Sequence, residues 1–142
     1  MNLKRIMATK AGWGMTVLRI PTGIIFIAHG LPKFGFMGGR GLEATAGFLG
    51  SLGLPLPMLM AWLVALAEVG GGALLIIGFL TRPAALTTAI SMFVAIFWVH
   101  FENGLAGQGG YQWALLLCAA SVALMIDGAG KGSLDRAIAG NR

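Results

Sequence analysis

Residues 58–80 read MLMAWLVALAEVGGGALLIIGFL, and Glu68 is the one charged residue among these 23 positions. The hydrocarbon core of a bilayer is roughly 30 Å thick, so about 20 apolar helical residues are long enough to cross it. This stretch therefore predicts a membrane-spanning helix. A carboxylate in the middle of such a helix costs on the order of 2.5–3.5 kcal/mol, so Glu68 needs a partner that offsets this cost.

The composition extends this interpretation to the whole chain. Of the 142 residues, 57% are hydrophobic and only 11% are charged, whereas a soluble domain carries about 25% charged residues. We therefore expect an all-α membrane protein that forms one domain, an antiparallel four-helix transmembrane bundle. The expected spans are residues 13–31, 58–80, 83–101 and 111–126, with an interfacial helix at 42–52 and a short cytoplasmic helix at 133–139.

The basic residues predict the orientation of this bundle. A pI of 10.2 would suggest a nucleic-acid partner for a soluble protein, but the positive-inside rule explains it better here. Lys33 and Arg40 fall on one side of the four spans, and Arg19 falls within the first span. The other side carries seven basic residues: Lys4, Arg5, Lys10, Arg82, Lys131, Arg136 and Arg142. We expect both termini in the cytoplasm and a multi-pass protein of the bacterial inner membrane, with no nucleic-acid partner.

Other features narrow the chemistry. The basic N-terminus and the apolar run after it predict a retained first span, since no small-residue cleavage pattern ends that run. Cys118 is the single cysteine, which excludes an intramolecular disulfide and a thiolate metal cluster. We expect no metal and no haem, because His29 and His100 are the only histidines. The glycine-rich loops precede no phosphate-binding motif, which argues against nucleotide binding.

Glu68 shares one helical face with small residues. At intervals of four, three and four, this face carries Ala61, Ala65, Glu68 and Gly72. Small residues let neighbouring helices approach closely, so Glu68 is expected to face protein and not lipid. The other deep charge is Arg19, in the first span. Helical rise separates the two backbones by roughly 8 Å in height, so an ion pair between them requires a stretched arginine side chain.

Every ionisable residue of the first span also lies on one face. With the same alternation of three and four, this face carries Arg19, Thr22, Phe26, His29 and Lys33. Gln112, at the start of the fourth span, lies at the external level of His29 and Lys33. His100 also lies at that level, but it is about 180° around the third helix from the inward-facing Ser91. His100 therefore joins the cluster only if the helix end unwinds.

These residues have two interpretations. In the first, Glu68 and Arg19 are a structural ion pair, Lys33 snorkels to the interface, and His29 and His100 contact loops. In the second, they form a proton-linked or ligand-binding site, because intramembrane ionisable residues are functional candidates by default. In this second interpretation the catalytic candidates are Glu68 and Arg19. The ligand-binding candidates are His29, Lys33, Gln112 and His100.

Eight different short motifs follow one another along most of the chain. They are Arg19, His29-Gly30-Leu31-Pro32-Lys33, Leu54-Pro55-Leu56-Pro57, Glu68-Val69-Gly70-Gly71, Thr81-Arg82, Asn103-Gly104, Gly109-Gly110 and Gly132-Ser133-Leu134-Asp135. In this order and spacing the sequence resembles the DoxX family of small four-helix bacterial membrane proteins, over about residues 14–139.

The resemblance implies membrane-bound respiratory chemistry. Some DoxX relatives are subunits of thiosulfate:quinone oxidoreductase, and others are described as quinol-linked or oxidative-stress proteins. Relatives often have Glu where this chain has Gln112, and an amide can hydrogen-bond a carbonyl but cannot relay a proton. The expected function is therefore a quinone-linked redox subunit with an externally opening pocket. In it His29 and Gln112 would hydrogen-bond the quinone carbonyls, and Glu68 would exchange the proton.

Two other functions stay open on the sequence alone. One is a non-enzymatic membrane scaffold or assembly partner of a redox enzyme, in which the polar cluster is structural. The other is a small-solute or proton-linked transporter, which would be oligomeric because one four-helix bundle is narrow. In each case the expected partners are the lipid bilayer and either further copies of the chain or the other subunits of a redox complex.

Overall fold

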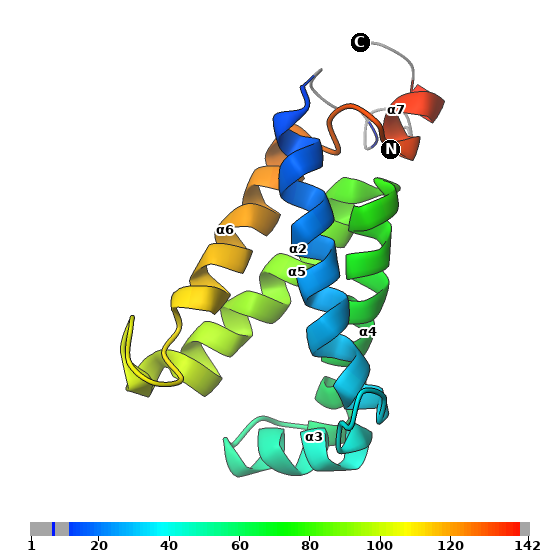
Figure 1. Ribbon diagram of the computed structural model, residues 1–142. Coiled ribbons are helices and arrows are strands. Elements are labelled where there is room, and N and C mark those ends of the chain that lie inside the picture. Colours follow the sequence, from blue (N-terminus) through cyan, green and yellow to red (C-terminus); the bar gives the residue numbers. More distant parts are fainter. Residues whose placement is uncertain (1–6, 8–11, 140–142) are drawn as a thin grey trace.

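Four long apolar helices form the body of the protein. The computed structural model describes residue 7 and residues 12–139, and every regular element in this part of the chain is helical. The four helices lie side by side, and successive ones run in opposite directions (Figure 1). They are α2 (Gly14–Gly30), α4 (Pro57–Ile77), α5 (Thr81–Val94) and α6 (Gln112–Asp127). The all-helical fold class predicted from the sequence is confirmed.

Short helical segments lengthen two of these helices. The 3₁₀ turn η1 (Leu31–Phe34) continues α2, and the π-helix η2 (Ala95–His100) and the 3₁₀ turn η3 (Phe101–Asn103) continue α5. Within the described residues, three helical runs are long and apolar enough to cross a membrane: Gly14–Phe34, Pro57–Ile77 and Thr81–Asn103. The fourth helix, α6, has 16 residues, or about 24 Å of helix. These ranges lie within three residues of the expected spans.

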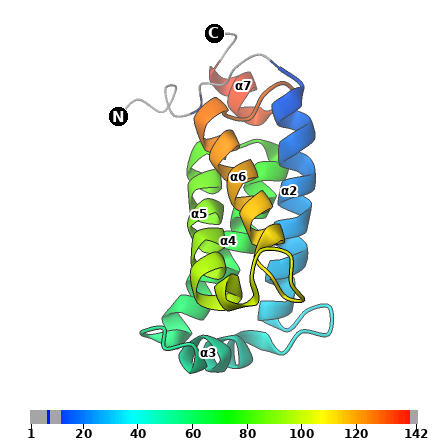
Figure 2. The ribbon, with the colours of Figure 1, turned by 90° about the vertical axis from the view of Figure 1, so that its left-hand side faces the viewer.

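Two short helices cover opposite ends of the long ones. Helix α3 (Gly41–Ser51) lies crosswise at the end where α2 finishes, and α7 (Leu134–Ala139) lies at the other end (Figures 1 and 2). Ala46 and Leu49 of α3 are buried against Ala61 of α4. The amphipathic stretch expected at residues 42–52 therefore forms a helix, and its apolar side packs on the start of α4.

Glycine decides how closely α2 and α4 pack. A Cβ atom on Gly23 would lie 2.5 Å from the carbonyl oxygen of Gly72, and one on Gly72 would lie 2.7 Å from the oxygen of Gly23. No side chain fits at either position, so the two backbones touch directly, as small residues allow in membrane helices. Gly78, with φ +70°, ends α4 and donates its N–H to Leu74 O at 2.8 Å. A turn this tight places α5 antiparallel to α4.

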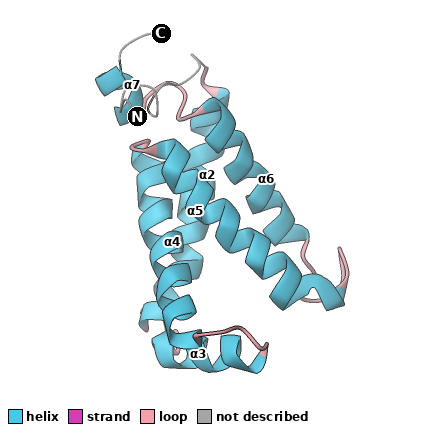
Figure 3. Cartoon of the chain, turned by 180° about the vertical axis from the view of Figure 1, so that it is seen from behind, coloured by secondary structure: helices cyan, strands magenta, loops and turns pink. Residues whose placement is uncertain are grey.

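The helix pairs separate toward the α3 end. Near α7 all four helices lie close together, but α5 and α6 splay away from α2 and α4 toward the other end (Figures 1 and 3). Phe26, Leu75 and Leu124, which are all fully buried, belong to the core between the pairs. The splayed end is where polar side chains of several helices meet.

Candidate functional site

Lys33 and Glu68 form an ion pair at the centre of the candidate site. Glu68 projects from the middle of α4 and is 4% exposed. The Nζ atom of Lys33 lies 2.5 Å from Oε2 of Glu68, and it also donates to the backbone oxygen of His29 at 2.9 Å. The carboxylate that the sequence placed inside the protein therefore has a counter-charge, which comes from the end of the first long helix.

The local fold explains how Lys33 reaches Glu68. The 3₁₀ turn η1 carries the axis of α2 one turn further, so Lys33 stays close to the face that His29 occupies. Gly30 lies between them at the crossing with α4. A Cβ atom on Gly30 would lie 2.6 Å from Val69 Cγ2 and 2.9 Å from Glu68 Cβ. Glycine at this position lets the end of α2 approach α4 closely enough for the ion pair to form.

The ion pair lies in the wall of a cavity of about 230 Å³. The cavity lies at the splayed end, between the α2–α4 pair and the α5–α6 pair, and α3 contributes to its wall. Its ionisable and polar lining residues are His29, Lys33, Thr45, Glu68, Ser91 and His100. The rest of the lining is apolar, including Phe26, Phe48 and Trp113. An apolar cavity with a few convergent polar groups is the usual form of a small-molecule site.

Ser91 adds a free hydroxyl to this wall. It lies on α5 and is 7% exposed. Within the described part of the chain, its Oγ atom has no hydrogen-bond partner. Buried hydroxyls are nearly always paired, and an unpaired one costs about 1–3 kcal/mol. A hydrogen-bonding group of a ligand in the cavity would pair with this hydroxyl, so Ser91 joins the candidate ligand contacts.

His100 joins the site through a change of helix type. On a regular α-helix it would point away from Ser91, but residues 95–100 form a π-helix, η2. The wider turn changes the angular position of the residues that follow, and His100 lines the cavity. Its Nδ1 atom lies 2.7 Å from the backbone oxygen of Gly109. π-helical turns occur frequently at functional sites.

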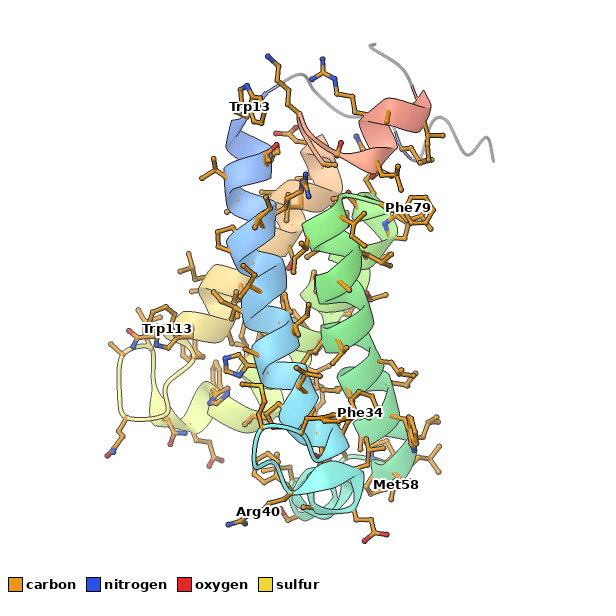
Figure 4. All side chains as sticks on the ribbon, turned by 45° about the vertical axis from the view of Figure 1, so that its right-hand side comes forward. Trp13, Phe34, Arg40, Met58, Phe79 and Trp113 are labelled. Carbon is orange, nitrogen blue, oxygen red and sulfur yellow. The ribbon has the colours of Figure 1, made fainter. Side chains whose placement is uncertain are left out.

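Gln112 lies outside the cavity. It is the first residue of α6 and is exposed, and its backbone N–H donates to Leu105 O at 3.0 Å. The next residue, Trp113, lines the cavity instead, and Figure 4 shows it at the start of α6. The position expected for Gln112 in the lining of the cavity is therefore occupied by Trp113, whose ring is apolar apart from its N–H group.

Arg19 lies near α7 and not near Glu68. It is 1% exposed, and its guanidinium group donates to the backbone oxygens of Leu75, Ile76, Ala129 and Gly132. Leu75 is seven residues beyond Glu68 along α4, which is about 10 Å of helix. The ion pair suggested from the sequence is therefore wrong, because the arginine side chain extends toward the other end of the bundle.

Asp135 fixes the same end of the bundle through contacts of its own. It is 1% exposed, and its two carboxylate oxygens accept the N–H groups of Leu80 and Thr81 at 2.7 and 2.9 Å. Its own N–H donates to Gly78 O at 2.8 Å. We call Arg19 and Asp135 the end lock, because they tie α2 and the segment before α7 to the turn between α4 and α5. Both belong to motifs quoted above, yet spacing alone did not place them at the same end of the bundle.

Thr45 and Phe48 of α3 are cavity residues that the sequence did not single out. The amphipathic pattern of residues 42–52 predicted a helix at the membrane surface, but it gave no sign that this helix borders a site. The signal that could have indicated its place beside the site is its position in the chain, directly before the span that carries Glu68.

Comparisons with known proteins match the chain to a family of membrane proteins. The DoxX family model matches residues 14–101. The chain is 38% identical to a Bacillus subtilis protein named "Putative oxidoreductase CatD", over 78% of each chain. It is 34% identical to the Escherichia coli inner membrane protein YqjF, over 87% of this chain and 90% of the relative. It is 29% identical to the E. coli inner membrane protein YphA, over 86% and 88%. No solved structure matches the chain.

Proposed function

This chain belongs to the DoxX family of membrane proteins, and we propose that it is a quinone-linked redox subunit of the bacterial inner membrane. The observation that carries the proposal is the cavity that both the Lys33–Glu68 pair and the unpaired Ser91 hydroxyl line. A flat ring with two carbonyl groups suits such a space, because it offers acceptors to the polar residues and an apolar face to the others.

The proposed membrane arrangement is an antiparallel four-helix transmembrane bundle with α7 and both termini in the cytoplasm. Arg82, Lys131 and Arg136 lie at the α7 end, and Lys33 and Arg40 lie at the α3 end. Lys4, Arg5, Lys10 and Arg142, which the sequence also assigned to the cytoplasmic side, lie outside the described residues. The positive-inside rule then places the cavity in the external half of the membrane.

Five polar or ionisable residues of the cavity have a role in this proposal. Reduction of a quinone to a quinol takes two electrons and two protons. The Ser91 hydroxyl and the Lys33 ammonium donate hydrogen bonds to the ring carbonyls, which polarises them. When Lys33 turns from Glu68 to the ring, the Glu68 carboxylate takes up a proton from the external side, past His29 and His100, and delivers it to a ring oxygen. A second uptake and delivery through Glu68 supplies the other proton. The electrons come from a donor protein of the same membrane complex.

Binding of a tail-free benzoquinone tests the proposal. In purified protein in lipid nanodiscs, Ser91→Ala should weaken binding about two- to tenfold, because a neutral hydrogen bond contributes about 0.5–1.5 kcal/mol. With electrons supplied by an electrode, Glu68→Gln should slow quinol formation by at least about 100-fold, which is the usual effect of losing a general acid. Glu43→Gln is the control, since Glu43 is exposed on α3 and does not line the cavity. Undetectable binding to the wild-type protein, or full activity in Glu68→Gln, would contradict the proposal.

A non-enzymatic scaffold is the second candidate. It is favoured by the end lock, which uses two buried charged residues purely to hold segments together. If the Lys33–Glu68 pair has the same purpose, Glu68→Gln should reduce the yield of the assembled complex. The electron-transfer rate per assembled complex would then stay at the wild-type value, and this measurement separates the two candidates.

A further inference from the structure

A second cavity, of about 260 Å³, adjoins the first one. The two cavities share part of their walls, at Leu49, Val64, Ser91 and Val94. The characters of the two cavities differ. The first contains the ion pair and both histidines, whereas the second is lined almost entirely by aliphatic side chains. A molecule that filled both would therefore need a polar end and an apolar end.

The second cavity lies between α4 and α5 and reaches the outer surface of the bundle. Leu63 and Ile90, which belong to its lining, are 51% and 55% exposed. Ala67 of α4 and Thr87 of α5 line this cavity and not the first one. In a membrane-embedded bundle this surface borders the hydrocarbon chains of the lipid, so the opening gives lateral access from the bilayer.

We propose that a quinone with an isoprenoid tail enters through this lateral opening. This inference rests on the function proposed above and adds the class of quinone and its route. The ring lies in the first cavity, beside Glu68 and Ser91, and the first isoprenoid units lie in the second cavity, between Ala67 and Thr87. Size supports two-part occupancy: each cavity alone is smaller than the roughly 300–1,000 Å³ typical of a small-molecule site, and the two combined fall within that range.

The position of α3 over the first cavity also supports this route. Thr45, Phe48 and Leu49 of α3 line that cavity from the aqueous end, so α3 stands between it and the external solution. A lipid-soluble quinone partitions into the bilayer and meets the lateral opening without passing α3. The tail then stays in an apolar environment throughout, and only the ring exchanges lipid for polar partners.

Photo-crosslinking tests the position of the tail. A benzoquinone with a diazirine on its first isoprenoid unit is added to wild-type protein in nanodiscs, irradiated, and located by peptide mass spectrometry. We expect labels within residues 60–67 of α4 and 87–94 of α5, and we expect excess unlabelled tailed quinone to remove them. Labels confined to α2 or α6 would overturn the inference. The same would follow if a phospholipid with a diazirine in its acyl chain gave an identical, uncompeted pattern.

Blocking variants give a second test. Ala67→Phe and Thr87→Phe fill the second cavity from opposite sides, and Leu86→Phe is the control, since Leu86 is 47% exposed on α5 and lines neither cavity. We expect each blocking variant to lower the ratio of tailed to tail-free quinone affinity at least fivefold and the control to keep it. An unchanged ratio in both blocking variants would overturn the route. If the tail-free ring did not bind the wild-type protein, the proposed function itself would fail.

Discussion

Lys33 and Arg19 are both cations near buried polar groups, but they are held in different ways. Arg19 donates to four backbone oxygens around its planar guanidinium group, so it is fixed in place. The Lys33 side chain is 23% exposed and has a compact ammonium group on a flexible stem. It can therefore turn from Glu68 to a ligand without breaking the fold. Lys33 is therefore suited to contact a ligand, and Arg19 is suited to a structural role.

Removing the Lys33 charge should destabilise the protein through Glu68. In Lys33→Met the buried carboxylate loses its counter-charge, and we expect the free energy of unfolding to fall by about 1–3 kcal/mol, less than for a fully buried pair because Lys33 is partly exposed. The double variant Lys33→Met/Glu68→Gln should recover part of this loss, and denaturant unfolding in detergent measures the cycle. Arg40→Met, which removes an exposed cation at the same end, should change stability by less than about 0.5 kcal/mol. Additive single effects would show that the two side chains do not interact.

Replacing Arg19 by lysine should affect stability and not chemistry. Lysine keeps the charge, but its three donors on one nitrogen cannot reproduce the fork that reaches Leu75, Ala129 and Gly132. We expect Arg19→Lys to cost about 2–4 kcal/mol of unfolding free energy, because buried carbonyl groups lose partners. Well below its melting temperature, the variant should bind tail-free benzoquinone as the wild-type protein does. A large loss of quinone affinity with unchanged stability would instead support the catalytic role first considered for Arg19.

Among the elements, the crossing of α2 and α4 decides whether the site forms. A Cβ atom on Gly30 would overlap Val69 and Glu68, so Gly30→Ala should push the helices apart, lower stability by about 1–3 kcal/mol and weaken quinone binding. The matched control is Gly70→Ala on α4, where an added Cβ has no neighbour within 4 Å. There, helix propensity alone predicts no loss and a gain of up to about 1 kcal/mol. Equal effects of the two substitutions on binding would show that close approach at Gly30 is not required.

The helices themselves were predictable from the sequence, because their apolar stretches and proline and glycine boundaries are local features. The inward face of α4 was predictable for the same reason, since Ala61, Ala65 and Glu68 are all buried as spacing indicated. The position of His100 was not predictable, because the prediction assumed a rotation of 100° per residue about the helix axis throughout the third span. The π-helix over residues 95–100 has a different rotation per residue, and no local sequence pattern predicted it.

The sequence also did not predict which residues of different helices contact each other. Arg19 was assigned to Glu68 because both are deep charges, but the partners of Arg19 are backbone oxygens, which carry no signal in a sequence. Lys33 was placed near the membrane surface, and the 3₁₀ continuation of α2 brings it to Glu68. Contacts of this kind depend on relative helix depth, and a shift of one turn, about 5.4 Å, changes every partner.

At the scale of the whole molecule, the two ends of the bundle have different structures. At the α7 end, the end lock joins three helices and the C-terminal segment through buried hydrogen bonds. At the α3 end, the helix pairs splay apart and enclose the cavities. A bundle that is tied at one end can change its spacing at the other with little disturbance of its core. In the proposed route, the ligand enters between α4 and α5 at the splayed end, away from the end lock.

The orientation of this asymmetric bundle in the membrane gives the last prediction. If the basic residues set the topology, the α3 end faces outward and the α7 end faces the cytoplasm. Leu105 lies in the loop before α6 and Leu134 begins α7, and they are 51% and 42% exposed. In a Cys118→Ser background, a membrane-impermeant maleimide added to spheroplasts should label Leu105→Cys at once and Leu134→Cys only after the membrane is disrupted. The Cys118→Ser protein should stay unlabelled in both conditions, because Cys118 is the only cysteine. The reverse pattern would place the cavities in the cytoplasmic half, and Glu68 would then exchange its proton with the cytoplasm.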